Sequence, residues 1–185
     1  SSDLRHRIMT SRMVRRKKPM PGLHKFKAKS RFCVHGHKDP DGGTFRTFAP
    51  TPSSEALNMV CQVIANEDLL LLFADVKAAF AQSDRLVRPR GRLFVEPCDG
   101  VPLDSGDLIE LVQPVYGLDD APLRWFETVP RFLRSMGLRK SLLDPCVYVR
   151  HDEHGELQLL ILIEVDDFVV AAKNDCRSCR RPRTS

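Results

Sequence analysis

The sequence predicts an α+β fold, in which an antiparallel sheet carries helices packed on one face. Leu159–Ile163 and Phe168–Val170 are apolar, strand-length runs rich in β-branched residues. The short acidic stretch between them predicts a tight turn, so the two runs should form an antiparallel hairpin. Elsewhere, helical spacing and short apolar runs follow one another without the regular alternation of a βαβ fold, which is typical of the α+β class.

The basic N-terminal part of the chain predicts a flexible lead over residues 1–24 and then a strand. Lys29–Gly36 alternates well enough for a strand, and because strand side chains alternate with a period of two, Lys29 and Arg31 should share one face. A helix should begin at Thr51-Pro52, since proline suits the first helical position. The buried face of this helix is expected to hold Leu57, Val60, Cys61 and Ile64.

The centre of the chain predicts a buried strand, Leu69–Ala74, which ends at Asp75 and leads into a short helical turn. A second helix is expected over residues 122–136, kinked at Pro130 because proline removes a backbone hydrogen bond. Residues 174–185 lose the hydrophobic pattern and predict a disordered tail. Further short strands are expected at residues 93–95, 108–112 and 146–149.

Composition narrows the class of protein. The chain has 185 residues, of which 42% are hydrophobic and 29% are charged, as in ordinary soluble domains. Its longest aliphatic runs are too short to cross a bilayer, and basic residues interrupt the N-terminus where a signal peptide needs an apolar stretch. We therefore expect a cytoplasmic or nuclear protein that is not secreted. Because the sequence does not begin with Met, we also expect a fragment.

The formal charge of +5 is distributed unevenly. Residues 1–40 carry 12 Lys and Arg against 2 acidic residues, whereas residues 41–172 carry 12 against 21. A basic arm on an acidic body indicates a polyanionic partner such as nucleic acid, with metal-binding acids elsewhere. The alternative is a solvated tail, which is the favoured interpretation for residues 1–20.

The six cysteines are scattered, which indicates free thiols in a reducing compartment and no disulfide framework. The first four lie in apolar or strand-like surroundings, where we expect them to be buried. Cys176 and Cys179 have half the spacing of a zinc site, but no second pair follows them.

Three acidic residues are candidate metal ligands. Asp166 and Asp167 lie at the turn of the predicted hairpin, and Asp75 ends a strand 91 residues before Asp166, so the two strands can be neighbours in one sheet. Carboxylates that converge at strand ends suit two Mg²⁺ ions about 3.5–4 Å apart, the arrangement used for in-line phosphoryl transfer. Aspartate is also common in turns and at helix N-caps, so each acid has a structural alternative.

Six short blocks follow one another along the chain. Two of them contain the acids, namely Asp75–Phe80 and Val165–Asp167. The others are Lys29–Gly36, Thr47–Pro50, Pro114–Leu118 with Ala121–Trp125, and Ser141–Cys146. In this order they resemble the reverse transcriptase of copia-type long-terminal-repeat retrotransposons, a part of the Pol polyprotein. The resemblance covers about residues 25–173.

This resemblance implies a right-hand polymerase of fingers and palm, with an antiparallel palm sheet and the thumb missing. Asp75, Asp166 and Asp167 would be the catalytic carboxylates and would bind two Mg²⁺ ions, or Mn²⁺ in their place, with the carbonyl of Val76 beside the metal. The reaction would be RNA-directed DNA polymerisation, and the partners an RNA or DNA template-primer and deoxynucleoside triphosphates. The implied nucleotide-binding residues are Lys29, Arg31, Val76, Phe80, Tyr116 and Gly117.

The resemblance also implies a role for each nucleotide-binding residue. Lys29 and Arg31 would neutralise the incoming triphosphate, while Tyr116 and Gly117 would lie beside the template base and the nascent pair. Phe80 would exclude the 2′-OH of a ribonucleotide by shape. A core phenylalanine on an amphipathic turn is an equal alternative for Phe80.

The chain departs from the family pattern at four places. Glu164 stands in place of a tyrosine and adds like charge beside the aspartate pair. Asp119-Asp120 replaces a basic and amide pair and should repel a phosphate backbone, and Ala81–Ser83 lacks a glycine. Finally, the chain stops soon after the hairpin, so we expect a truncated enzyme that is weak or inactive alone.

Two further functions stay open. The chain could be a non-catalytic remnant of a retroelement that binds nucleic acid through its basic arm. It could also be an RNA-binding sheet module of similar topology, but such a module needs exposed aromatic residues on its central strands, and the sequence contains no such cluster.

Overall fold

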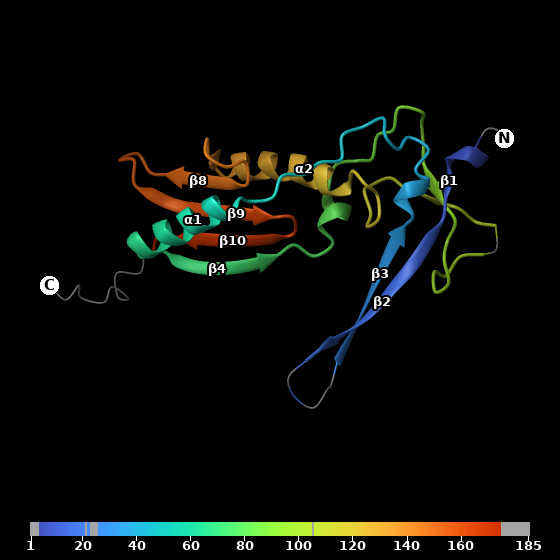
Figure 1. The fold of residues 1–185 in the computed structure, drawn as a ribbon, viewed down its shortest axis with the longest axis horizontal. Coiled ribbons are helices and arrows are strands. Elements are labelled where there is room, and N and C mark those ends of the chain that lie inside the picture. Colours follow the sequence, from blue (N-terminus) through green and yellow to red (C-terminus); the bar gives the residue numbers. More distant parts are fainter. Residues whose placement is uncertain (1–3, 21, 23–25, 105, 175–185) are drawn as a thin grey trace. The chain divides into compact units, whose positions relative to one another are not determined.

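The computed structural model describes residues 4–20, 22, 26–104 and 106–174, and the chain divides into two compact units (Figure 1). The first unit comprises residues 1–48 and 80–125, and the second comprises residues 49–79 and 126–185. The described residues form two α-helices, three 3₁₀ turns and three sheets, which confirms the α+β class. None of their helices is both long and apolar enough to cross a bilayer.

A long antiparallel ribbon and a small sheet build the first unit. The ribbon pairs β2 (Ser11–Pro19) with β3 (Phe26–Val34) over their full lengths. The sheet has the order β1-β5-β6, with β1 parallel to β5 and β5 antiparallel to β6. Its strands are β1 (Ile8–Met9), β5 (Phe94–Val95) and β6 (Ile109–Glu110), and the 3₁₀ turns are η1 (Arg5–Arg7) and η2 (Gly36–Lys38).

Strand β2 lies where the sequence predicts a flexible lead, so the structure differs from that expectation. The side chains of β2 are mostly basic, and therefore no hydrophobic periodicity marks it as a strand. It forms because β3 supplies backbone hydrogen-bond partners along its whole length. The domain boundaries, 1–24 for the lead and 25–173 for the polymerase domain, stay a prediction. Residues 175–185 of the expected tail lie outside the described residues.

An apolar core holds the first unit together. Met9, Val34 and Val95 are almost fully buried at its centre. Burying a side chain of this size stabilises a fold by about 1.5–3 kcal/mol. The remaining buried members of this cluster are Leu93, Leu111, Leu118 and Ala121.

The first unit also buries paired charges. Arg7 lies 2.8 Å from Asp41, and the two side chains are only 2% and 0% exposed. Arg88 donates two hydrogen bonds to Asp120, at 2.6 and 2.8 Å, and one to Asp39 at 2.7 Å. Because a buried charge without a partner is costly, each of these groups fixes the position of its partner.

A five-stranded antiparallel sheet with the order β4-β10-β9-β8-β7 builds the second unit. β9 (Leu157–Glu164) and β10 (Asp167–Ala172) form the hairpin that the sequence predicts. β4 (Leu70–Asp75) lies at one edge, antiparallel to β10. The other elements are β7 (Arg139–Lys140), β8 (Val147–His151), α1 (Ser54–Asn66), residues 126–135 of α2 (Ala121–Ser135), and the first residue of η3 (Ala79–Gln82).

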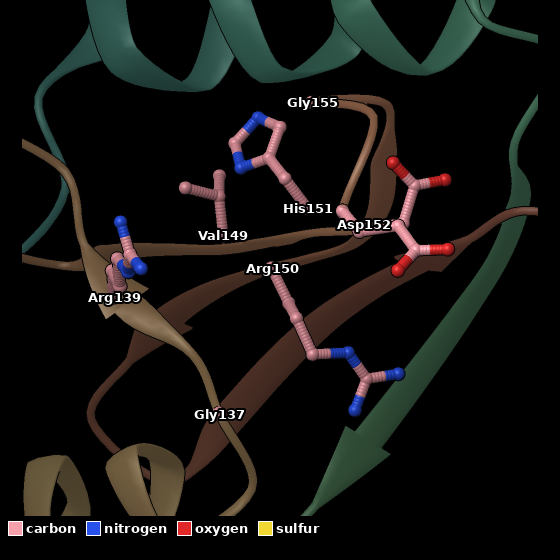
Figure 2. Close-up of a pocket in the computed structure, with 8 residues that line it drawn as sticks. Gly137, Arg139, Val149, Arg150, His151, Asp152 and Gly155 are labelled. Atoms are coloured by element: carbon pink, nitrogen blue, oxygen red, sulfur yellow. The ribbon is translucent and has the colours of Figure 1, made fainter.

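Helices α1 and α2 lie on opposite faces of this sheet, so the prediction that the helices pack on one face is wrong. The reason is that Leu160–Ile163 are four consecutive residues, each at most 5% exposed, and both faces of β9 therefore need cover. On one face, Val60 of α1 packs in a cluster with Leu162. On the other, Arg150 donates a hydrogen bond to the carbonyl of Met136, just after α2, and Figure 2 shows a helix on each side of the strands.

Two surfaces predicted to be buried are exposed. In α1 the buried positions are Ala56 and Val60, whereas Leu57 and Cys61 are exposed. The helix begins at Ser54 and not at Thr51-Pro52, and the side chain of Ser53 caps it. Strand β4 was expected to be buried, yet its residues Leu70–Phe73 are 45–76% exposed. Among the described residues only β10 pairs with β4, which therefore forms an edge of the sheet.

The four cysteines within the described part of the chain are free thiols. Cys146 is buried, and burial, together with the nearby Asp144 carboxylate, raises the pKa of its thiol to about 12. Cys61 is exposed, so the expectation of buried thiols is wrong there. Cys176 and Cys179 lie outside the described residues.

We predict that Asp120 makes the fold sensitive to acid. Burial alone would raise the pKa of Asp120, but hydrogen bonds from Arg88 and Arg124 outweigh it and lower this pKa. A lowered folded-state pKa adds stability above the unfolded-state value of about 3.9, and that stability is lost as the pH falls through the folded-state pKa.

Asp120→Asn should therefore cost about 3–5 kcal/mol of unfolding free energy at pH 7, and less as the pH falls below about 4. Urea unfolding of both proteins at a series of pH values measures this. A cost that does not vary with pH would contradict the role given to Asp120.

Candidate active site

A strained two-residue turn closes the β9–β10 hairpin. Glu164 is the partner of Asp167 across the hairpin, and Val165 and Asp166 form the turn between them. Val165 has a φ of +57°, which β-branched residues rarely adopt and which usually requires glycine at this position of a hairpin turn. Such strain costs on the order of 1–3 kcal/mol and is concentrated at functional sites.

The pairing of β10 with β4 brings the two acidic segments together. Asp75 and Asp167 are partners in the antiparallel register, so their side chains leave the same face of the sheet. The backbone N–H of Val76 donates a hydrogen bond to the carbonyl of Asp166 at 2.8 Å. The strand that ends at Asp75 and the hairpin that carries Asp166 are thus neighbours in one sheet, as predicted.

A cavity of about 370 Å³ opens at this corner of the sheet. Asp75, Glu164 and Asp167 line it and are exposed, while Asp166 is half-buried. The other lining residues are Phe73, Ala74, Phe168 and Val169, so no basic side chain of the described residues contributes to the wall. Like charges on neighbouring strands repel one another, and a cation bound here would relieve that repulsion.

The acidic residues fit Mg²⁺ by the type of atom they offer. Carboxylate oxygens are hard ligands, and Mg²⁺ usually takes one or two of them and completes its shell with water and substrate phosphates. Within the described ranges, no three Asp, Glu, His or Cys side chains are grouped closely enough to hold a metal by themselves.

In the first unit, the loop Pro114–Leu118, which the resemblance assigns to the template side, lies beside the end of β3. The backbone N–H of Val34 donates a hydrogen bond to the carbonyl of Tyr116 at 2.8 Å. The guanidinium of Arg31 lies 5.3 Å from the centre of the Tyr116 ring, and the Phe80 ring centre lies 4.9 Å from it. Three predicted nucleotide-binding residues are thus brought together, while Lys29 is exposed on the same face of β3 as Arg31.

Phe80 is either a residue that excludes the 2′-OH of a ribonucleotide or a core phenylalanine, and its contacts bear on both interpretations. It is half-buried and packs against the apolar core of the first unit, as a core phenylalanine would. Its ring contact with Tyr116 keeps it among the nucleotide-binding candidates, so the role of excluding ribonucleotides stays a prediction. Val76 and the three aspartates belong to the second unit, whereas the other nucleotide-binding candidates belong to the first.

Two glycines allow the loop and β3 to approach each other. A Cβ atom at Gly117 would lie 2.0 Å from the carbonyl oxygen of Val34, and one at Gly36 would lie 2.0 Å from the carbonyl oxygen of Gly117. Gly117 also has a φ of +99°, which favours glycine. Only glycine permits this contact at both positions.

Asp120 does not act as the sequence suggested. Asp119-Asp120 was expected to repel a phosphate backbone, and Asp119 is indeed exposed. Asp120, however, is only 2% exposed and is paired with Arg88 and Arg124, so it offers no free charge to a ligand. The i,i+4 spacing of Asp120 and Arg124, across the start of the helix, is the sequence signal for this pairing.

A second cavity, of about 410 Å³, lies at the β7–β8 edge of the second unit (Figure 2). Arg150 points away from His151, and its guanidinium is held by the carbonyl of Met136, so the basic side chains do not converge. None of the predicted site residues lines this cavity. Its lining consists of Gly137, Arg139, Val149, Arg150, His151, Asp152, Glu153 and Gly155.

The chain belongs to the reverse transcriptase (RNA-dependent DNA polymerase) family, whose profile matches residues 3–178. More particularly, it is a distant relative of copia-type retrotransposon Pol polyproteins, which confirms the resemblance seen in the motifs. It is 26% identical over 149 residues to the retrovirus-related Pol polyprotein from transposon TNT 1-94 of Nicotiana tabacum, and 25% identical over 157 residues to that from transposon RE2 of Arabidopsis thaliana.

These two alignments cover 79% and 82% of this chain but only 11% and 10% of the relatives. The chain therefore spans about a tenth of the length of the curated relatives it matches. No solved structure matches the chain significantly.

We predict that Gly117→Ala destabilises the chain by about 3 kcal/mol or more, because the added methyl group meets the Val34 carbonyl and the positive φ is strained. Gly43→Ala is the matched control, since Gly43 has a φ of +79° but nothing within 4 Å of an added Cβ. It should cost only about 1–2 kcal/mol. Urea unfolding compares them, and equal costs would show that the close contact is unimportant.

Proposed function

We propose that this chain is the fingers and palm of a copia-type reverse transcriptase and catalyses RNA-directed DNA synthesis by two-metal nucleotidyl transfer. The main support is the register of β10 against β4, which puts Asp75 opposite Asp167 at the end of a sheet, with Asp166 in the adjoining turn. Membership of the reverse transcriptase family supports the proposal that these acids serve in nucleotidyl transfer.

In this proposal Asp75, Asp166 and Asp167 hold two Mg²⁺ ions, or Mn²⁺ in their place, together with the backbone carbonyl of Val76. When bound, the ions would lower the pKa of the primer 3′-OH and stabilise the charge on the pyrophosphate leaving group. The exposure of Asp75 and Asp167 leaves their oxygens accessible to such ions. Glu164, which lines the same cavity, would add a further negative charge.

The basic and aromatic residues of the first unit would bind the nucleotide. Lys29 and Arg31 would neutralise its triphosphate, and both lie on one face of β3. The contact between Arg31 and the Tyr116 ring would fix the guanidinium in place. Tyr116 and Gly117 would lie beside the template base and the nascent pair, and Phe80 would close the site against a 2′-OH. Most of the rate would come from this positioning.

A second candidate function is supported by a separate observation. The described residues contain no ready-made group of three metal ligands, while the first unit presents many exposed cations on its ribbon. A remnant that binds nucleic acid but does not catalyse would show the same two features. The two candidates differ in what they predict for metal binding and for primer extension.

Primer extension on an RNA template with a DNA primer tests the proposal. We expect weak but measurable extension with Mg²⁺ or Mn²⁺, and a loss of about 100-fold or more in Asp75→Asn or Asp166→Asn. Asp68→Asn is the matched control, because Asp68 is exposed next to β4 and its φ of +52° is tolerated by asparagine. Absence of extension with either metal would leave only the non-catalytic candidate.

Metal affinity gives a readout that is independent of activity. Titration with Mn²⁺, followed by electron paramagnetic resonance, should show that Asp75→Asn weakens binding by about tenfold or more, because a charged ligand is lost. Asp68→Asn should bind Mn²⁺ as the wild type does. If Asp75→Asn also binds Mn²⁺ with unchanged affinity, Asp75 does not share an ion with the aspartates of the hairpin.

A further inference from the structure

Two histidine side chains meet just after strand β3 in the first unit. His35 and His37 lie on either side of Gly36, and their ring centres are 5.7 Å apart, with the ring planes inclined at 55°. His35 is half-buried and His37 is exposed. Neither belongs to the residues proposed for polymerisation, so the proposed function leaves this pair without a role.

The separation of the two rings fits imidazoles that bind one ion. A Zn–N bond is about 2.0–2.1 Å long, which puts each ring centre about 3.2 Å from the ion. Two ring centres would then be about 5.2 Å apart at the ideal tetrahedral angle, and about 5.7 Å apart if that angle opened to about 125°. Because a ring can turn about its metal–nitrogen bond, the inclination of 55° is compatible with such a site.

Thr10 holds the ring of His35 in place. The hydroxyl of Thr10 lies 2.7 Å from Nδ1 of His35, and the backbone N–H of His35 donates a hydrogen bond to the carbonyl of Thr10 at 3.0 Å. When Nδ1–H donates to the hydroxyl, the lone pair of Nε2 is available to an ion. Metal-binding histidines are generally oriented in this way, by a hydrogen bond from their second ring nitrogen.

A carboxylate approaches the same segment. A Cβ atom at Gly36 would lie 2.8 Å from a carboxylate oxygen of Asp119, so Asp119 is close to the residue between the two histidines. Asp119 is exposed, and the proposed polymerase chemistry gives it no role. Because no three such side chains of the described residues form a ligand group as they stand, Asp119 has to turn toward the rings to reach a shared ion.

We propose that His35 and His37 bind a divalent transition-metal ion such as Zn²⁺, with Asp119 as a third ligand and water in the remaining position. Two imidazoles and a carboxylate form a donor set that is typical of zinc. Mg²⁺ prefers oxygen ligands, so this site differs in chemistry from the acidic corner of the second unit. The inference does not depend on the proposed function, because the contacts that support it involve none of the catalytic candidates.

An ion at this position would connect two segments of the first unit. The histidines follow β3, and Asp119 follows the loop Pro114–Leu118, which contacts this segment through Gly36 and Gly117. An ion bound by both segments would stabilise that contact. Since the unfolded chain does not hold these ligands together, the ion would also stabilise the folded chain.

The chain contains a matched control for this site. His35→Gln/His37→Gln removes both rings, and His151→Gln/His154→Gln removes two exposed histidines of the second unit. Both double variants therefore lose two imidazoles. Circular dichroism and urea unfolding verify that each variant folds like the wild type.

Isothermal titration calorimetry with ZnCl₂ measures the binding. All proteins also carry Cys176→Ser and Cys179→Ser, because thiolates bind Zn²⁺ themselves, and excess MgCl₂ competes for the acidic corner. Loss of both rings of the site should raise Kd about 100-fold or more, and Asp119→Asn should raise it about tenfold. The His151/His154 variant should keep Kd within about twofold.

Thr10→Val tests the site without removing a ligand. This variant loses the hydroxyl that orients His35 and keeps both rings, so it should raise Kd for Zn²⁺ about tenfold. An unchanged Kd would contradict the orientation of His35 on which the proposal depends.

An unchanged Kd in the His35/His37 variant would overturn the proposal. An equal rise in the two double variants would overturn it as well, because it would indicate nonspecific binding to surface histidines. Asp75→Asn should bind Zn²⁺ with the wild-type Kd. Absence of primer extension with histidine-dependent Zn²⁺ binding therefore contradicts the proposed function alone, whereas extension without such binding contradicts this inference alone.

Discussion

The central constraint in the second unit is the register between β4 and β10. It aligns Asp167 with Asp75, while the hairpin turn aligns Asp167 with Glu164, so three carboxylates leave one face of the sheet at one corner. Such crowding of like charge opposes folding and is tolerated only where water or a cation can reach it. A shift of one residue in the register would send Asp75 to the opposite face and abolish the arrangement. The strained φ of Val165 belongs to the same corner, and backbone strain of this kind is concentrated at functional sites.

The first unit depends on a different kind of constraint, which is close backbone packing supported by buried ion pairs. Gly36 and Gly117 let the loop Pro114–Leu118 contact the end of β3, and this places Arg31 against Tyr116. The pairing of Arg88 with Asp120 anchors the start of α2, directly after that loop. Truncating one partner of such a pair is costly, so the geometry of the loop is tied to residues that need not touch a substrate.

Much of this arrangement follows from the sequence, and the exceptions have physical causes. Apolar runs ending in acids predicted the hairpin and its neighbour, because the period and composition of a strand are local properties. The prediction that the helices pack on one face of the sheet was wrong because Leu160–Ile163 is apolar on both faces. The apolar sequence of this segment does not reveal which helix covers which face. Strand β2 was missed because pairing with β3, a non-local interaction, stabilises a sequence without apolar alternation. The burial of Asp120 likewise depends on Arg88, 32 residues away.

The most direct test of the proposed metal site is a crystal structure of the chain soaked with Mn²⁺, with ions located by anomalous scattering. The account predicts a peak at the corner of the sheet, contacted by a carboxylate oxygen of Asp75 and by one from Asp166 or Asp167. A peak bound by the hairpin acids alone, with Asp75 directed elsewhere, would contradict it.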